Sequence, residues 1–135
     1  MSFNIRVEGL AKLNMKLRNI PLKFHPIYNE AIKKSIFDVE RETKPITPVS
    51  KSRKGHTGGH LRKSISRGIG YSDLQGWIES KTKYGIFVHE GTKNWPLSKP
   101  PRLPGTVRQF LKVGTARAMP RINRYFDEAT KKLIK

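Results

Sequence analysis

The longest amphipathic stripe in the chain runs through residues 24–39, and it constrains the fold more than any other feature. Apolar side chains recur there at steps of three and four residues, a period that is typical of a helix with one buried face. Pro45 and Pro48 follow the stripe and end the predicted helix, because proline cannot continue a helix interior. The stripe consists of Phe24, Ile27, Tyr28, Ala31, Ile32, Ser35, Ile36 and Val39.

Two shorter patterns precede this helix. Apolar and polar residues alternate over residues 3–7, which is typical of a strand. Apolar residues then recur at helical spacing from Leu10 to Ile20. Pro21 ends that helix or opens the next one. The sequence therefore predicts a strand and two helices in the N-terminal third of the chain.

Residues 61–80 carry the pattern of a β-hairpin. Side chains alternate between apolar and polar around Ile65 and Ile69, with a helical turn possible at the start of the segment. Ser72-Asp73, followed by Gly76, indicates a turn, and residues 77–80 form the returning strand. The strand predicted at residues 3–7 is a candidate third strand beside this hairpin.

Residues 84–92 form the segment that we expect to organise the fold. Their sequence is Tyr-Gly-Ile-Phe-Val-His-Glu-Gly-Thr. The apolar run at residues 86–88 predicts burial. Short apolar runs are ambiguous between a helix and a central strand. Gly91 favours a short helix, because glycine readily adopts the positive φ that ends one.

The C-terminal part begins with a loop and ends with a helix. Prolines at four positions between residues 93 and 107 exclude both a helix interior and a central strand. Residues 110–113 restart the apolar pattern, as a strand. A last helix follows, with Pro120 near its start or at a kink. Its apolar stripe is Met119, Ile122, Phe126, Ala129 and Leu133.

These elements predict one α+β domain over residues 1–135. We expect a small antiparallel sheet of about three to four strands, packed by two N-terminal helices and a long C-terminal helix. Two long loops complete the domain: a flexible basic loop at 47–60 and the proline-rich loop at 93–107. Loops of this length in a compact domain are usually functional or disordered.

The formal net charge of +18 limits the possible partners. A chain with this charge attracts polyanions such as nucleic acid, acidic lipid surfaces or acidic proteins. The segment from Lys44 to Lys63 contains no acidic residue. The chain has no cysteine, which excludes disulfides and thiolate metal sites. Neither a signal-peptide pattern nor an apolar run of membrane-spanning length is present, so we expect synthesis in the cytoplasm and no membrane partner.

Catalytic and cofactor motifs have little support in this sequence. His56 and His60 lie four residues apart in a glycine-rich loop, with no cysteine or nearby acid to complete a metal site. For His89-Glu90, a helix-end Glu90 paired with an arginine is the favoured interpretation over acid–base chemistry. Phosphate-loop and dinucleotide fingerprints are absent. We expect neither an enzyme nor a cofactor or metal.

Four motifs in order give the chain a resemblance to a known family. They are Thr47-Pro48, Thr57–Ile65, Tyr84–Thr92 and Phe110-Leu111. Together with the opening strand and the leucine-striped helix, they resemble the head–tail joining, or neck and tail-completion, proteins of tailed bacteriophages, typified by gene product ten of the lambdoid Hong Kong phage. Two departures affect the loops. Residues 49–56 are a basic insertion, and the usual Arg-Pro-Phe-Leu is Arg-Gln-Phe-Leu at residues 108–111.

The resemblance implies a structural virion protein at the head–tail junction. Such proteins form a homo-oligomeric ring, hexameric or dodecameric, between head-connector and tail proteins around the DNA channel. Basic side chains are then candidates for contact with an acidic neighbour or, nonspecifically, with phage DNA: Lys51, Arg53, Lys54, Arg62, Lys63, Arg117, Arg121 and Arg124. Four further residues are assigned to the fold or a subunit interface: Tyr84, Phe87, Glu90 and Gly91. The alternative is a small basic nucleic-acid-binding protein.

Overall fold

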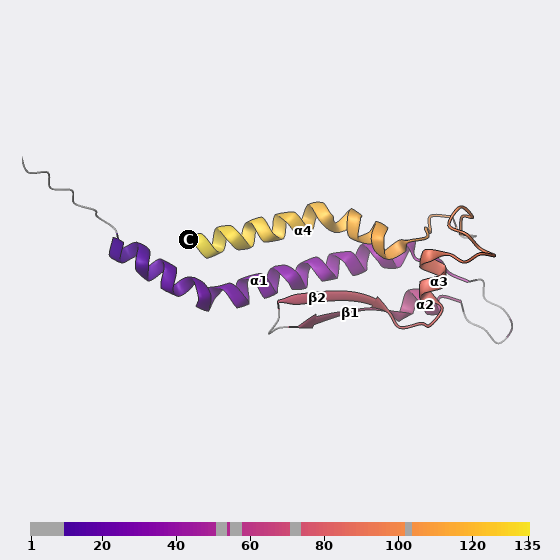
Figure 1. Cartoon of the computed structure of the whole chain (residues 1–135), viewed down its shortest axis with the longest axis horizontal. Coiled ribbons are helices and arrows are strands. Elements are labelled where there is room, and N and C mark those ends of the chain that lie inside the picture. The colour runs from indigo at the N-terminus through magenta and orange to yellow at the C-terminus, as the bar shows by residue number, and fades with distance from the viewer. Residues whose placement is uncertain (1–9, 51–53, 55–57, 71–73, 102–103) are drawn as a thin grey trace, which may run out of the picture.

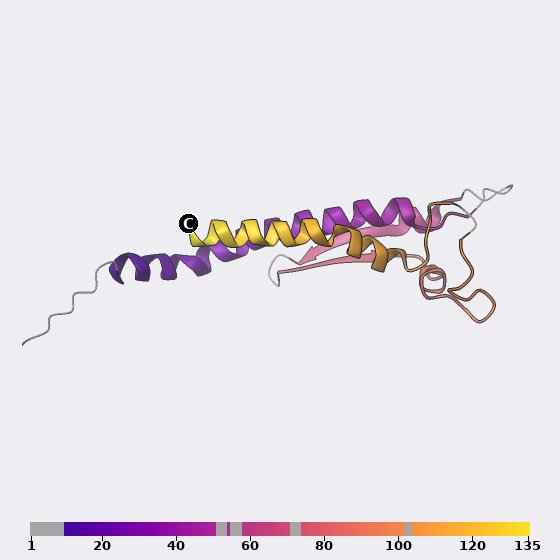
Figure 2. The same ribbon diagram turned by 90° about the horizontal axis from the view of Figure 1, so that it is seen from above.

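The computed structural model describes residues 10–50, 54, 58–70, 74–101 and 104–135 of the chain. The molecule is elongated, with a long helix along which a second long helix and a β-hairpin lie (Figures 1 and 2). Its elements, in chain order, are α1 (Leu10–Ile46), α2 (His60–Ser64), β1 (Ile65–Gly70), β2 (Gln75–Ser80), α3 (Gly85–Glu90) and α4 (Phe110–Ile134). The predicted α+β class, with an antiparallel hairpin, a long N-terminal helix and a long C-terminal helix, is confirmed.

α1 is one helix of 37 residues, so the prediction of two helices separated at Pro21 is wrong. Pro21 and Pro26 both lie inside it, and Figure 1 shows α1 bending in its first half. An interior proline removes one backbone hydrogen bond and kinks a helix, but the flanking turns can continue. The apolar stripes before and after Pro21 share the same period and phase, so one continuous helix accommodates both.

The sheet of the described residues has two antiparallel strands, fewer than the three to four predicted. Ile65 pairs with Ser80, and Ile69 pairs with Gly76. The predicted strand at residues 3–7 lies outside the described residues. The predicted strand at residues 110–113 is wrong, because these residues form the first turn of α4. A short apolar run fits both periods, and sequence alone does not separate them.

The hydrophobic core lies at one end of the molecule, where segments distant in sequence meet. Phe110, at the start of α4, is fully buried there. Ile46 from the end of α1, Leu61 from α2 and Ile65 from β1 surround it. Val88 of α3 packs against this cluster. The core therefore joins α1 and α4 to the hairpin and to both short helices.

α1 and α4 approach most closely at Gly114, where the backbone of α4 lies against Thr43. A Cβ built on Gly114 would lie 2.1 Å from Thr43 Oγ1 and 2.9 Å from Thr43 Cα. One helical turn further along α4, Ala118 is fully buried. Pro120 lies inside α4, ten residues after its start, and not near the start as one of the two predicted options had it. Small side chains at 114 and 118 let the two helices pack tightly in this region.

Gly114→Ala is expected to lower the free energy of unfolding by about 1–3 kcal/mol, the usual cost of overpacking. In an exposed helix interior, glycine-to-alanine stabilises the folded protein by about 0.5–1 kcal/mol. The sign of the change in the free energy of unfolding therefore shows whether Gly114 lies in a tight helix contact. Urea denaturation followed by circular dichroism measures it. Thr43→Ala in the same chain removes the nearest atom, Oγ1, and should restore part of the loss. A gain in stability from Gly114→Ala alone would show that the helices do not approach this closely.

Candidate interaction surfaces

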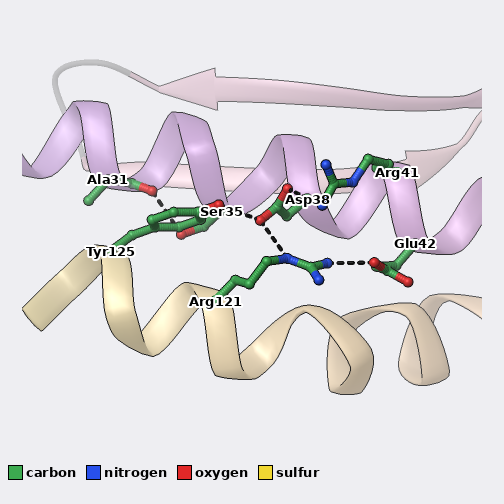
Figure 3. Close-up of polar contacts among 7 residues, drawn as sticks. All are labelled: Ala31, Ser35, Asp38, Arg41, Glu42, Arg121 and Tyr125. Carbon is green, nitrogen blue, oxygen red and sulfur yellow. Dashed lines mark hydrogen bonds and ion pairs between the residues drawn. The ribbon is translucent and has the colours of Figure 1, made fainter.

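A network of charged residues joins α1 to α4. Tyr125 and Arg121 of α4 both point toward Asp38 of α1 (Figure 3). The Tyr125 hydroxyl donates to Asp38 Oδ2 at 2.6 Å, and Arg121 Nε donates to the same oxygen at 2.9 Å. Arg121 Nη2 also donates to Glu42 at 2.5 Å, and Arg41 pairs with the other Asp38 oxygen at 3.2 Å. Asp38 is therefore a buried carboxylate with three partners.

The surroundings of Asp38 favour its charged form. Burial alone would raise the pKa of its carboxyl group. The hydrogen bonds from Tyr125 and Arg121 and the charges of Arg41 and Arg121 outweigh burial, so the pKa lies below its ordinary value. At Glu40, burial likewise raises the pKa of the carboxyl group. The hydrogen bonds and charges of Lys44 and Arg67 outweigh burial, so the pKa of Glu40 also lies below its ordinary value. Asp38 and Glu40 are thus each paired with basic side chains within the molecule, which leaves the net positive charge to the remaining surface.

Some of the basic residues that we predicted as partner contacts are engaged within the molecule, and others are exposed. Arg121 faces α1 and is engaged with Asp38 and Glu42, as described above. Arg62 donates from Nη2 to the carbonyl oxygens of Pro45 and Thr47, each at 3.0 Å, and so ties α2 to the end of α1. The exposed members are Lys54, Lys63, Arg117 and Arg124. Lys51 and Arg53 lie outside the described residues.

α3 confirms the predicted short helix but not its predicted burial. Ile86 and Phe87 are 63% and 57% exposed, and only Val88 of the apolar run packs against the core. The opposite side of the helix faces inward, where a Cβ on Gly85 would meet the Ser80 and Leu61 side chains. Tyr84, before the helix, is also exposed. Of the four predicted interface residues, Tyr84 and Phe87 therefore present an apolar surface at this end of the molecule.

The other two predicted interface residues have local roles. Gly91 ends α3 with φ +84°, where a side chain is strained. A Cβ built on Gly91 would also lie 3.1 Å from Leu97 N and 3.3 Å from Trp95 O, so a side chain would be crowded. Glu90 pairs with His89 Nδ1 at 2.5 Å, so within the described part of the chain its partner is this histidine and not the predicted arginine. At the last residue of a helix the side chain can fold back onto its neighbour, which the interior of a helix does not allow.

Arg108 organises the proline-rich loop, a role that the sequence patterns did not indicate. It is buried, and its guanidinium donates to the carbonyl oxygens of Pro96 at 2.8 Å, Val88 at 3.3 Å and Phe87 at 3.4 Å. The same group lies 3.9 Å from the centre of the Trp95 ring. A guanidinium satisfies several acceptors and stacks on an aromatic ring at once. Arg108 therefore fastens the loop to α3.

Arg108→Lys is expected to open the proline-rich loop without unfolding the protein. A lysine ammonium cannot reach these acceptors in the same planar geometry. We expect trypsin to cleave after Lys93 about tenfold faster, which corresponds to about 1.4 kcal/mol of local stability. The matched control is Arg117→Lys on the exposed surface of α4, which should leave the rate unchanged. Equal cleavage rates in the two variants would refute the role of Arg108.

Comparisons with protein-family models, with curated proteins and with solved structures find no match for this chain. A functional proposal therefore rests on the sequence and the structure of this chain alone. No group of three or more metal-ligating side chains gathers anywhere in the described ranges. None of the helices in the described part of the chain has the length and hydropathy needed to cross a membrane.

Proposed function

We propose that this chain is a non-enzymatic structural protein of a tailed phage, which assembles as a ring at the head–tail junction and joins the tail to the head connector around the DNA channel. The observation that carries the proposal is the convergence of the four phage-like motifs. Thr47, Leu61, Val88 and Phe110 each belong to one of them. All four segments meet at one end of the molecule, where Phe110, Leu61 and Val88 share the core and Thr47 is buried.

Uncovered apolar side chains at both ends support an assembly. Figures 1 and 2 show the first part of α1 extending beyond the end of α4. Leu13, Leu17 and Leu22 are exposed on this extension, and Ile86 and Phe87 are exposed on α3 at the opposite end. Leu13 and Leu17 lie one helical turn apart on α1, and Ile86 and Phe87 are adjacent on α3. Exposed apolar side chains that cluster in this way mark interaction sites. Two different surfaces at opposite ends suit head-to-tail contacts, which produce a ring when the rotation between neighbouring subunits closes.

The basic surface suits a position beside DNA or an acidic neighbour. Changing Lys51, Arg53 and Lys54 together to serine tests whether the basic loop makes this contact. We expect particles carrying this variant to lose head–tail joining. The deficit relative to the wild type should be largest at low salt and should narrow as salt increases, because salt screens the same charge contacts in the wild type. Lys131, Lys132 and Lys135 at the end of α4, changed in the same way, are the charge-matched control. Normal joining by the loop variant at every salt concentration would refute this role for the loop.

The alternative function, a small nucleic-acid-binding protein, is favoured by the net charge of +18. Binding of the free subunit to duplex DNA across a salt series separates the two proposals. Tight binding with a steep dependence on salt supports the nucleic-acid-binding protein. Weak binding together with self-association supports the ring.

A further inference from the structure

An apolar groove of about 390 Å³ runs between α1, β2 and α4. Ile32, Ile36 and Val39 of α1 line it together with Ile78 of β2 and Ile122 and Phe126 of α4. β1 contributes no residue to it. The groove is open to solvent even though its lining is mostly aliphatic and aromatic, so it offers an unfilled apolar site beside the hairpin.

The edge of β2 borders this groove. In the described part of the chain β2 pairs only with β1, so the backbone groups of its other edge have no strand partner. An unpaired strand edge is a template for another strand. The groove and the open edge together therefore fit an extended segment with one apolar face.

Residues 3–7 have this pattern. Phe3, Ile5 and Val7 would lie on one face of a strand, and Asn4 and Arg6 on the other. Their length of about five residues matches the six residues of β2. With the apolar face turned into the groove, the polar face would point to solvent.

This segment cannot reach the groove of its own copy. Val7 and Leu10 are three residues apart, a span of at most about 11 Å. Leu10 begins α1, and Ile32 lies 22 residues further along the helix, at about 33 Å. Figure 1 shows the start of α1 at the far end of the helix from the core. The bend in α1 removes only a small part of this distance, so only another copy can supply the segment.

We propose that residues 3–7 of one copy add a third strand to the free edge of β2 in a neighbouring copy, with Phe3, Ile5 and Val7 in the groove. The contact joins two different surfaces, one on each copy, so its repetition produces a ring where the rotation between neighbouring copies closes. The inference deepens the proposed function, because it rests on the ring and names the subunit contact that would hold it.

Engineered disulfides test the contact, because the chain has no natural cysteine. Arg6→Cys is combined with Gln75→Cys in one variant and with Glu79→Cys in another. Both β2 positions are exposed, and they lie near opposite ends of the strand, so the two variants test different alignments of the added strand along β2. Paired strands bring Cα atoms within disulfide range. The full-length variants are oxidised over a series of protein concentrations, in salt that screens the charge. We expect a ladder of disulfide-linked multimers that disappears with reductant.

The control places the second cysteine off the edge, as Arg6→Cys with Lys112→Cys, an exposed position on α4. Only monomers, an intramolecular disulfide, or an equal ladder in the control would overturn the proposal. Ile5→Asp and Asn4→Asp give an independent readout. Sedimentation should show self-association at least tenfold weaker for Ile5→Asp and unchanged for Asn4→Asp, with identical circular dichroism spectra; equal association in the two variants would contradict the contact.

The two proposals fail separately. Absence of the ladder, in a phage whose heads and tails still require this protein to join, would refute the strand exchange and keep the proposed function. A specific ladder, in a phage that joins normally without the protein, would support the contact between copies and refute the joining function.

Discussion

Replacing Phe110 by alanine is expected to lower the free energy of unfolding by about 3–5 kcal/mol. Phe110 is fully buried at the point where α1, α2 and β1 meet, and its ring packs edge-on against His89 at 5.1 Å between ring centres. Truncation removes the buried ring and leaves a cavity that the surrounding elements cannot fill without moving. Denaturation with urea, followed by far-ultraviolet circular dichroism, gives the value.

Phe87→Ala at the same end of the molecule is the matched control. Phe87 is 57% exposed, so its truncation should change the free energy of unfolding by no more than about 0.5 kcal/mol. The comparison tests whether the core is built on Phe110 and not on the apolar run of α3. Similar losses for both phenylalanines would contradict the packing described above.

Arg121→Ala is expected to lower the free energy of unfolding at neutral pH, and by more than the same change at an exposed arginine of α4. The reason is that it leaves Asp38, whose side chain is only 4% exposed, without its closest cationic partner. Removing one partner of a buried ion pair is costly because the remaining charge keeps its burial penalty. Arg117→Ala, at an exposed arginine one turn earlier on α4, is the control and should be nearly neutral. Equal effects of the two changes would show that Arg121 does not support the helix pair.

The pH dependence of these variants gives a second readout of the same network. In the wild type the pKa of Asp38 lies below its ordinary value of 3.8, so its contribution to stability is present above that value and is lost as pH falls through the lowered pKa. In Arg121→Ala the pKa of Asp38 rises, so protonation relieves the buried charge at a higher pH. The stability difference between wild type and variant should therefore be largest near neutral pH and should narrow in acid. A difference that stays constant with pH would contradict this assignment.

Local periodicity predicted the elements whose pattern is long or closed by a clear turn. The stripe at residues 24–39 predicted the part of α1 that packs on α4, and Gly91 predicted the end of α3. Pro21 led to the wrong prediction of two helices, because a proline usually ends a helix. The apolar stripes on its two sides stay in phase, so α1 bends and continues. Residues 110–113 misled because four residues are too few to distinguish the two periods.

The interaction surfaces were less predictable, because they depend on contacts between distant residues. Arg117, Arg121 and Arg124 have similar positions along one helix, but Asp38, 83 residues away in sequence, engages only Arg121. Arg108 similarly acquires its role from carbonyl groups of α3 and of the proline-rich loop. No local pattern encodes either contact. The exposure of Ile86 and Phe87 likewise follows from the position of α3 at the end of the molecule, and not from its sequence.

The most direct test of the proposed joining function is electron microscopy of a lysate from a phage in which this gene is disrupted, with the gene restored from a plasmid as the control. The account predicts filled heads lying apart from tails, or tails with abnormal head-proximal ends, and joined particles after restoration. Intact, joined particles in the absence of the gene would contradict it.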